Sequence, residues 1–303
     1  MAITMYDILI VGAGPAGLTA AIYAKRAGKS VLILEKGTFG GQMTYSPKIE
    51  NYPGFQVLSG MELADKMVEQ ALGLGAEIEI DTILQMKDEG DKKVLTGESG
   101  VYEGKTVIIA TGAKHRLLGA PGEAELVGNG ISFCAVCDGA FFEGRDVLVI
   151  GGGNSALQEA SLLCQTCRKV TVVQNLAFLT GEQKLQEFLF AKENVSFIYS
   201  ATVESFRKEG DTIVTAVTAD GVRRELSSDG VFVAIGLAPD NDPFKDVVAL
   251  DRGYIASNEQ CLTNCPGVFT AGDCRTKNVR QIATAVSDGA VAALAACRYI
   301  EEA

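Results

Sequence analysis

The residues best suited to chemistry are Cys134 and Cys137, which are separated by two residues and followed directly by Asp138. Two thiols at this spacing can close an exchangeable disulfide, and a helix that starts here would lower the pKa of the first thiol. Asp138 is the only other titratable side chain in the motif. If burial raises its pKa, it can protonate a departing thiolate; the alternative is a carboxylate that caps backbone N–H groups.

Two glycine-rich turns, 139 positions apart, form an internal repeat. Each follows an apolar run, Asp7-Ile-Leu-Ile-Val in the first copy and Asp146-Val-Leu-Val-Ile in the second. In a nucleotide-binding unit the first glycine makes the tight turn, the second lets the backbone approach a pyrophosphate, and the third small residue allows close helix–strand packing. The repeat therefore predicts two such units, in which Gly12, Gly14 and Gly17 correspond to Gly151, Gly153 and Ala156.

The two copies differ at the position that contacts a ribose. The first has Glu35, whose carboxylate can accept hydrogen bonds from a ribose diol, and the second has Gln174. From Val170 to Gln183 there is no Arg or Lys for the 2′-phosphate of NADP. The first site therefore has the groups that bind an adenosine ribose. The second has the glycine turn but no group that recognises the ribose; the alternative is that it keeps its glycines only because strand and helix must pack closely.

Composition and charge exclude several classes of protein. The net charge of −11 argues against nucleic acid as a partner, because phosphate binding needs a concentrated basic face. Asp7 and the first glycine turn interrupt the N-terminal apolar run. We therefore expect no signal peptide, no membrane span and a cytoplasmic location.

The other six cysteines are expected to be mostly buried thiols, because a large α/β core in a reducing compartment needs no disulfides. Cys164 and Cys167 form a second pair on one helix face, whose role stays open. An iron–sulfur cluster would call for three closely spaced cysteines, and no such run occurs. We expect no metal site.

The order of motifs predicts one domain inserted into another. The strand Thr106-Val-Ile-Ile and its small-residue turn are echoed by Gly230-Val-Phe-Val and a similar turn, and each closes one nucleotide unit. The remaining tail is too short for a third domain and is expected to complete the first. The fold class is therefore α/β, with two Rossmann-like domains of three ββα layers. The first comprises residues 1–116 and 244–303, the second residues 117–243, and a hinge is expected near 114–120 and 239–246.

These motifs together resemble the low-molecular-weight thioredoxin reductases over nearly the whole chain. The motifs are Gly12-Ala-Gly-Pro-Ala-Gly, Gly40-Gly-Gln-Met, Glu50-Asn-Tyr-Pro-Gly, Ala110-Thr-Gly-Ala, Cys134-Ala-Val-Cys-Asp, Gly151-Gly-Gly-Asn-Ser-Ala, Ala271-Gly-Asp and Arg280-Gln-Ile-Ala-Thr-Ala. The resemblance implies bound FAD, thioredoxin as the partner and a homodimer. It also implies that Cys137 faces the flavin and that Cys134 attacks the thioredoxin disulfide, with Asp138 as the acid. The residues expected around FAD are Gly12, Gly14, Pro15, Ala16, Glu35, Lys36, Gly41, Gln42, Asn51, Thr111, Gly112, Gly272, Asp273, Arg280, Gln281 and Ile282.

One departure concerns the electron donor. Most of the family has a His-Arg-Arg type run where this chain has Gln174-Asn-Leu. The chain therefore most resembles the branch of ferredoxin-dependent flavin thioredoxin reductases, which lacks nicotinamide recognition. Two alternatives stay open: an NAD(P)H-dependent thioredoxin reductase with an atypical ribose pocket, and a flavin-bound redox sensor.

Some other side chains that suggest chemistry have simpler explanations. His115, the only histidine, is expected to be a surface residue of the linker rather than a catalytic base. Tyr23 and Tyr45 are expected in the ordinary core. The charged run from Lys87 to Lys93 is expected to form a solvated hairpin turn.

Overall fold

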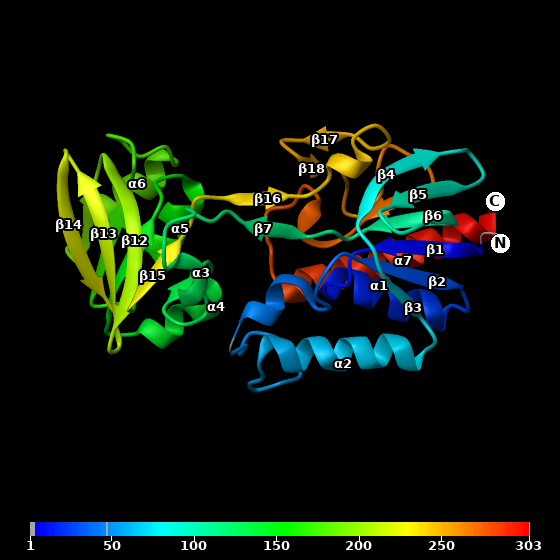
Figure 1. The fold of residues 1–303 in the computed structure, drawn as a ribbon, viewed down its shortest axis with the longest axis horizontal. Helices are drawn as coiled ribbons and strands as arrows, with labels where there is room; N and C mark the ends of the chain where they lie inside the picture. The colour runs from blue at the N-terminus through cyan, green and yellow to red at the C-terminus, as the bar shows by residue number, and fades with distance from the viewer. Residues whose placement is uncertain (1–3, 47, 303) are drawn as a thin grey trace. The chain divides into compact units, whose positions relative to one another are not determined.

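The computed structural model describes residues 4–46 and 48–302, and the chain divides into two compact units (Figure 1). Unit 1 combines Met1–Lys114 with Ala238–Ala303, and unit 2 is His115–Leu237. The two crossings between the units lie a few residues before the predicted ones, after 116 and 243. At the crossings the short strands β7 (Ala113–His115) and β16 (Leu237–Pro239) pair with each other.

Unit 1 is built on a parallel sheet whose strand order is β3-β2-β1-β6, with β19 also paired to β6. The apolar run after Asp7 forms the centre of β1, and Ile8, Leu9 and Ile10 are completely buried. Such continuous burial is typical of parallel strands that are covered on both faces. The strands are β1 (Met5–Val11), β2 (Val31–Glu35), β3 (Glu77–Ile80), β6 (Val101–Ile109) and β19 (Val268–Thr270).

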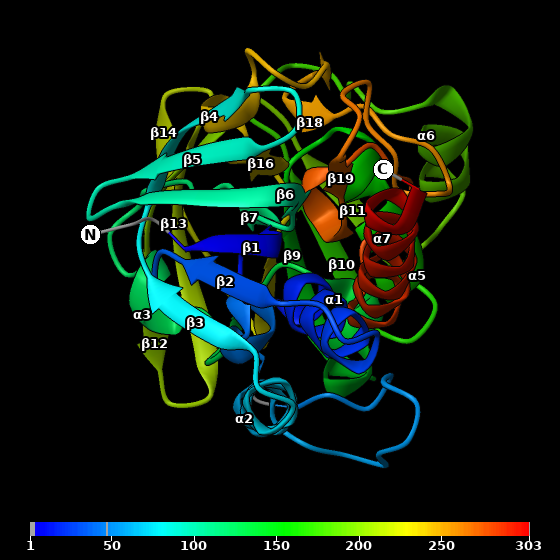
Figure 2. The same ribbon diagram turned by 90° about the vertical axis from the view of Figure 1, so that its right-hand side faces the viewer.

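Three helices cover one face of this sheet (Figure 2): α1 (Pro15–Arg26), α2 (Gly60–Gly73) and α7 (Ile282–Glu302). Helix α1 starts with a proline directly after the glycine turn, where the missing N–H costs nothing. Helix α2 starts with a capping box between Ser59 and Glu62. Helix α7 packs against α1 at Gly289, where an added Cβ would lie 2.2 Å from the carbonyl oxygen of Ala16. The C-terminal tail therefore completes the first unit, as expected.

The other face of the unit 1 sheet carries the antiparallel hairpin β4 (Ile83–Asp88) and β5 (Lys93–Gly97), which pairs with β6. The predicted hairpin is present, but the prediction that its whole charged run is solvated is wrong. Lys93 is 1% exposed, and its Nζ donates to Asp88 Oδ1 at 2.7 Å and to the Gly90 carbonyl at 2.8 Å. These two acceptors within the turn let the ammonium group be buried.

Unit 2 has three layers: a parallel sheet with the order β11-β10-β9-β15-β8, helices on one face and a three-stranded antiparallel sheet on the other. This confirms the predicted α/β fold class. The helices of the helical layer are α4 (Ala135–Asp138), α5 (Asn154–Leu163) and α6 (Gln183–Phe190), whereas the short helix α3 (Glu123–Leu126) lies on the other face, where Leu126 joins the core under the antiparallel sheet. The parallel strands are β8 (Ile131–Ser132), β9 (Asp146–Ile150), β10 (Lys169–Val173), β11 (Val195–Ile198) and β15 (Gly230–Val233), and the antiparallel ones are β12 (Ala201–Glu209), β13 (Thr212–Ala219) and β14 (Val222–Ser228).

Three expectations about aromatic side chains are wrong. His115 is not a solvated linker residue, because its side chain is partly buried, its ring stacks on Phe133 with centroids 4.7 Å apart, and burial lowers its pKa to about 4. Tyr23 and Tyr45 do not belong to the core, since they are 42% and 65% exposed. Tyr23 lies on the outer side of α1 and Tyr45 ends a short 3₁₀ turn, η1 (Gly41–Tyr45), so neither faces a packed layer.

The cysteines outside the motif behave as expected, because all six are buried free thiols. Within residues 4–46 and 48–302 no group of three or more His, Cys, Asp or Glu side chains could hold a metal ion. The same residues contain no helix with both the length and the apolarity needed to cross a membrane.

Candidate functional site

The first glycine turn has the shape that a dinucleotide requires. Gly12 has φ +109°, and an added Cβ would lie 2.3 Å from the carbonyl oxygen of Ala110. At Gly17 an added Cβ would lie 1.9 Å from the Gly12 carbonyl oxygen, so only hydrogen fits at either position. Gly14, in contrast, has no atom within 4 Å of an added Cβ. The space in front of the α1 N-terminus is therefore open, where a pyrophosphate would meet backbone N–H groups.

A cavity of about 590 Å³ in unit 1 adjoins this turn. Gly12, Glu35, Lys36 and Thr111 line it, so the structure brings these four predicted residues together. Glu35 Oε2 accepts the Ala13 N–H at 2.7 Å, and Oε1 accepts the Gly37 N–H at 2.9 Å. The carboxylate is thus fixed at the end of β2, the position at which a ribose diol would donate to it.

Asp273 supplies a second sign that unit 1 is built for a ligand. It lies in the 3₁₀ turn η4 (Gly272–Cys274), and its Oδ1 is buried without a hydrogen-bond partner among the described residues. Burial raises the pKa of Asp273, although Lys277 and Arg280 lower it. Unpaired buried acceptors are rare because they lose hydration without compensation. A hydroxyl group of a bound cofactor would satisfy this oxygen.

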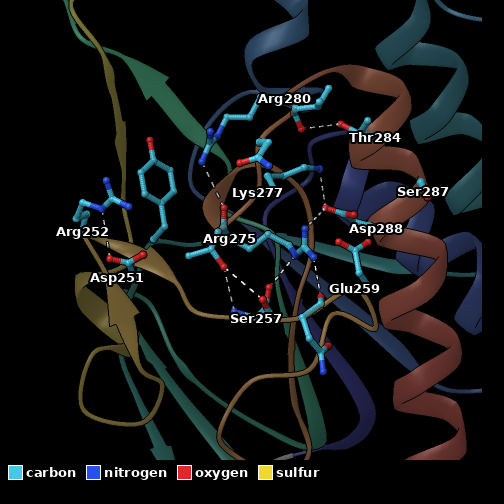
Figure 3. Close-up of a pocket in the computed structure, with 15 residues that line it drawn as sticks. Asp251, Arg252, Ser257, Glu259, Arg275, Lys277, Arg280, Thr284, Ser287 and Asp288 are labelled. Carbon is cyan, nitrogen blue, oxygen red and sulfur yellow. Dashed lines mark hydrogen bonds and ion pairs between the residues drawn. The ribbon is translucent and has the colours of Figure 1, made fainter. Parts of the chain in front are cut away.

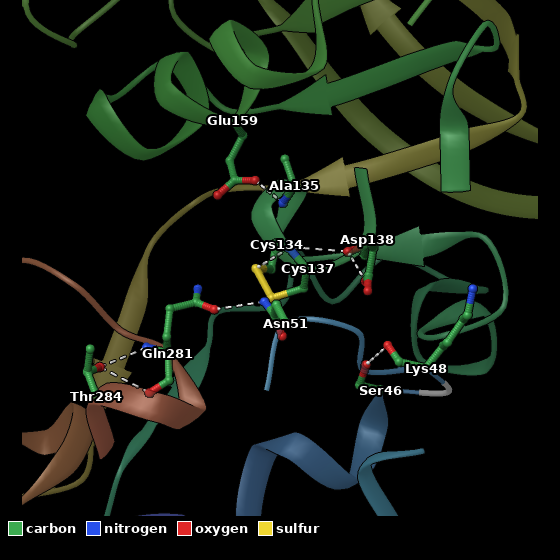
Figure 4. Close-up of a disulfide and its surroundings, with 11 residues drawn as sticks. Ser46, Lys48, Asn51, Cys134, Ala135, Cys137, Asp138, Glu159, Gln281 and Thr284 are labelled. Carbon is green, nitrogen blue, oxygen red and sulfur yellow. Dashed lines mark hydrogen bonds between the residues drawn. A yellow bond between two sulfur atoms is a disulfide. The ribbon is translucent and has the colours of Figure 1, made fainter. Parts of the chain in front are cut away.

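The remaining predicted cofactor residues lie on turns and helix starts of unit 1. An added Cβ on Gly41 would lie 3.4 Å from Gly14 Cα, so η1, which includes Gln42, begins beside the first glycine turn. Asn51 donates from Nδ2 to Gln281 Oε1 at 3.3 Å (Figure 4). The other members are Pro15 and Ala16 in the first turn of α1, Gly112 with φ +70° after β6, Gly272 with φ +81° in η4, Arg280 stacked on Tyr254, and Ile282 at the start of α7.

A larger hollow of about 970 Å³ in unit 1 lacks the glycine turn (Figure 3). Arg280 is the one predicted cofactor residue in its lining. Three charged side chains in its lining neutralise one another. Lys277 Nζ lies 2.8 Å and the Arg275 guanidinium lies 3.6 Å from Asp288 Oδ2. The smaller cavity, which holds the open turn and Glu35, is therefore the candidate cofactor site.

In unit 2, Cys134 and Cys137 form a disulfide with Cα atoms 5.3 Å apart (Figure 4). Cys134 is the N-cap of α4, and its Sγ accepts the Cys137 N–H at 3.2 Å. This contact favours negative charge on the Cys134 sulfur once the disulfide opens. Both cysteines are partly exposed, so a protein disulfide can be attacked at this position.

Asp138 meets the condition set for a proton donor. Its Oδ2 accepts the Ser132 hydroxyl at 2.6 Å, and Ser132 Oγ in turn accepts the Cys134 N–H at 3.1 Å. Burial raises the pKa of Asp138, while the Ser132 hydrogen bond lowers it. Its side chain caps no backbone N–H of the turn that follows, and its Oδ1 is buried and unpaired within the described residues. The capping alternative thus finds no support in the hydrogen bonds.

Two further residues at these sites escaped sequence reasoning. The Glu159 carboxylate on α5 accepts the N–H of Ala135, directly after Cys134 (Figure 4). Asn241 is 1% exposed; its Oδ1 accepts the Thr111 hydroxyl at 3.0 Å, and its Nδ2 donates to the carbonyls of Gly253 and Cys274. Nothing in the sequence identifies Glu159, and the only signal at Asn241 is the polar run around it.

The second glycine turn is closed by its own chain. Gln174 is 5% exposed, and its amide packs so closely on Gly152 that an added Cβ there would lie 2.5 Å from Gln174 Cδ. The Gly152 carbonyl accepts the N–H groups of Thr180 and Gly181 at 2.8 and 3.0 Å. The Gln174 amide also bonds within its loop, accepting the Asn175 N–H at 3.1 Å. The hydrogen-bonding groups of Gln174 are therefore used locally.

Comparison with known proteins places these features in a family. The sequence pattern described as "Pyridine nucleotide-disulphide oxidoreductase" matches residues 6–289. The thioredoxin reductase of Listeria monocytogenes is 45% identical over 302 residues, covering 98% of this chain and 95% of the relative. A "34.2 kDa protein in rubredoxin operon" of Clostridium pasteurianum is 44% identical over 298 residues, covering 97% of each. The crystal structure of the Streptococcus pyogenes thioredoxin reductase is 42% identical, with a TM-score of 0.95 and full coverage of both chains.

These relatives cover nearly the whole chain, including both units and the motif with the disulfide. Thioredoxin reductases of this kind bind FAD, which confirms the cofactor that the family resemblance implies. The chain therefore belongs to the thioredoxin reductase family of FAD-dependent disulfide oxidoreductases.

Proposed function

We propose that the protein reduces the disulfide of thioredoxin through the Cys134–Cys137 pair, with FAD bound at the smaller cavity of unit 1. The observation that carries this proposal is the partly exposed disulfide beside a buried carboxyl whose pKa is raised. FAD supplies the means of taking up electrons from a donor and passing them on as a pair to a disulfide. The unpaired Asp273 oxygen and the open space at Gly14 fit this cofactor.

The two sulfurs have different roles. Electrons enter the disulfide at Cys137, and the Cys134 thiolate, favoured by the Cys137 N–H, attacks the disulfide of thioredoxin. Asp138 gives a proton to the thiolate that leaves. Six of the eight cysteines are free thiols, which fits a reducing cytoplasm. The homodimer stays a prediction.

For the electron donor we infer ferredoxin, because unit 2 has no acidic residue at the Gln174 position and no Arg or Lys from Val170 to Gln183 to recognise the ribose of a nicotinamide dinucleotide. An acidic residue at the Gln174 position would favour NAD, and an arginine in the following loop would pair with the NADP phosphate. The loop has neither, and Gln174 packs on Gly152 instead. The relative from the rubredoxin operon adds support, since rubredoxin, like ferredoxin, carries single electrons.

NAD(P)H is the second candidate, and the comparisons favour it over ferredoxin. Relatives that are 45% and 43% identical carry the name thioredoxin reductase without reference to ferredoxin. The second glycine turn also keeps Gly151 with φ +130°, where an added Cβ would lie 2.6 Å from the Ala234 carbonyl oxygen. A dinucleotide could therefore use the turn if its phosphate charge were met from elsewhere in the chain.

The donor is tested by mixing the oxidised FAD protein anaerobically with NADPH, NADH or reduced ferredoxin and following the flavin absorbance. We expect ferredoxin to bleach the flavin rapidly and both nucleotides to do so negligibly. Bleaching by micromolar NADPH would replace ferredoxin with the second candidate. Steady reduction of thioredoxin in the same mixture would exclude the redox sensor.

A gain of function makes this test sharper. Asn175 and Leu176 are exposed, so Asn175→Arg with Leu176→Arg should fold normally and supply the missing cations. We expect this variant to be reduced by NADPH about tenfold faster than the unchanged protein, with reduction by ferredoxin unaffected at about 0.3 M salt, where the added charge is screened. The matched control is Asn175→Gln with Leu176→Gln, which adds polar length without charge. No gain in the arginine variant would mean that missing cations are not what excludes NADPH.

A further inference from the structure

A second carboxyl group lies against the redox motif of unit 2 and has no part in the mechanism above. Glu159 projects from α5, which packs on α4, and its carboxylate accepts the Ala135 N–H (Figure 4). Ala135 directly follows Cys134 and is the first residue of α4. Through this hydrogen bond Glu159 holds the backbone at the sulfur that attacks thioredoxin.

Among the residues that the structure describes, no cation acts on Glu159 to hold it ionised. Burial, with a smaller contribution from the Asp138 carboxylate, raises its pKa to about 7 against the opposing effect of the Ala135 N–H. The charged side chains of the neighbouring elements point to solvent or are paired: Lys184 and Glu187 on α6, Lys169 on β10 and Glu143 before β9 are exposed, and Asp146 on β9 bonds Arg168. Asp138 is the charged group that acts on Glu159 while the disulfide is closed.

We propose that Glu159 is a positioning residue for the redox pair and that it takes up a proton when the Cys134–Cys137 disulfide is reduced. Opening the disulfide leaves a thiolate close to the Ala135 N–H that Glu159 holds. A new negative charge in a partly buried site favours the neutral form of a neighbouring carboxyl. Glu159 would thereby compensate the charge of the nucleophilic thiolate, and it would release the proton when the disulfide forms again.

The step balances in atoms and charge. A disulfide, an ionised Glu159, two electrons and two protons give one thiol, one thiolate and a neutral Glu159, with a net charge of −1 on both sides. The Sγ–Sγ bond breaks, the pair is reduced, and the electrons are those that FAD delivers. One proton reaches the thiol through Asp138, which solvent reprotonates, and the other goes to Glu159. The inference rests on the proposed redox role of Cys134 and Cys137.

The test is the pH dependence of the dithiol–disulfide equilibrium in the FAD-loaded protein. Oxidised and reduced dithiothreitol set the poise from pH 5.5 to 9, and alkylation with mass spectrometry of the Cys134–Cys137 peptide measures the reduced fraction. Glu159→Gln keeps an oxygen that can accept the Ala135 N–H but cannot bind the proton. Glu187→Gln on α6 is the control, since that side chain is exposed and its carboxylate accepts a hydrogen bond from Gln183 on the same helix.

We expect unchanged protein and Glu187→Gln to behave alike. Relative to Glu159→Gln, their equilibrium constant for reduction should fall by about tenfold for each pH unit above about 7, until Glu159 is ionised in the reduced state as well. Identical pH dependence in Glu159→Gln would overturn the proposal. The proposal would also be wrong if Asp138→Asn no longer took up the extra proton on reduction while Glu159→Gln still did. That proton would then belong to Asp138.

Failure of the inference can be told apart from failure of the proposed function. If the Cys134–Cys137 peptide cannot be reduced, or if Cys134→Ser reduces thioredoxin at the full rate, the redox assignment itself is wrong. If the peptide is reduced normally with a pH dependence that Glu159→Gln leaves unchanged, only the role of Glu159 is lost. A merely structural role would lower the turnover of Glu159→Gln without altering the proton count.

Discussion

Glu35 accepts two backbone N–H groups and still borders the cavity of unit 1. Glu35→Ala should therefore weaken FAD retention by roughly 1–3 kcal/mol, the usual cost of leaving a buried hydrogen-bonding group unpaired. Glu35→Gln, which keeps one acceptor, should lose less. The measurement is FAD occupancy after gel filtration and dilution, with Glu69→Ala on the exposed side of α2 as the control. Full occupancy in Glu35→Ala would remove this residue from the ribose site.

We expect Asp138 to act as a proton donor, because burial raises the pKa of its carboxyl group. Its raised pKa keeps the acid form to higher pH than an ordinary aspartate, and only this form can protonate a departing thiolate. Thioredoxin reduction should therefore fall as pH rises through that pKa. In Asp138→Asn the rate should drop by about 10²–10⁴ and this alkaline decline should disappear. Steady-state turnover between pH 5.5 and 9 measures both effects, and an unchanged profile would mean that another group gives the proton.

At the scale of elements, the sequence predicts what local spacing controls. Gly12, Gly17 and Glu35 lie where the strand–turn–helix pattern places them, because each position is set by neighbours a few residues away. The features that the sequence does not predict depend on contacts that the fold creates. Asn241 bonds Thr111 across 130 positions, and the Glu159 carboxylate meets Ala135 only because α5 packs on α4. Lys93 is buried because its turn folds back to supply two acceptors, which charge patterning does not reveal.

The packing of α7 on α1 can be tested with Gly289→Ala. This substitution improves helix propensity but introduces a clash between the two helices. Alanine is favoured over glycine inside a helix by about 1 kcal/mol. Gly289→Ala should nevertheless destabilise the protein by about 1–3 kcal/mol, because the new Cβ would lie 2.2 Å from the Ala16 carbonyl oxygen. Gly73→Ala in α2, where nothing lies within 4 Å, should be neutral or stabilising. Thermal unfolding of the two variants compares them directly, and equal effects would show that α1 and α7 can separate without cost.

At the scale of the whole molecule, the repeat has diverged into two units with different tasks. Unit 1 keeps an open glycine turn and a ribose carboxylate, whereas unit 2 keeps the turn but fills it with Gln174. Unit 2 instead carries the disulfide and the partly buried carboxyls Asp138 and Glu159. Under the proposed function, the same strand–turn–helix frame supports cofactor binding in one copy and dithiol chemistry in the other.

The net charge of −11 constrains how an acidic electron donor can approach. Reduced ferredoxin must meet a local cluster of basic side chains, because the average field of the protein repels it. Flavin reduction by ferredoxin should therefore slow several-fold between about 0.02 and 0.3 M salt, as the Debye length shortens and attraction at the cluster is screened. Reversing one charge in that cluster should lower the second-order rate constant more than the rate at saturation. Stopped-flow measurements over this salt range, with the small reductant dithionite as the control, provide the test. A rate that increases with salt would mean that repulsion by the whole molecule outweighs any local attraction, and that the chain has no docking site for an acidic donor.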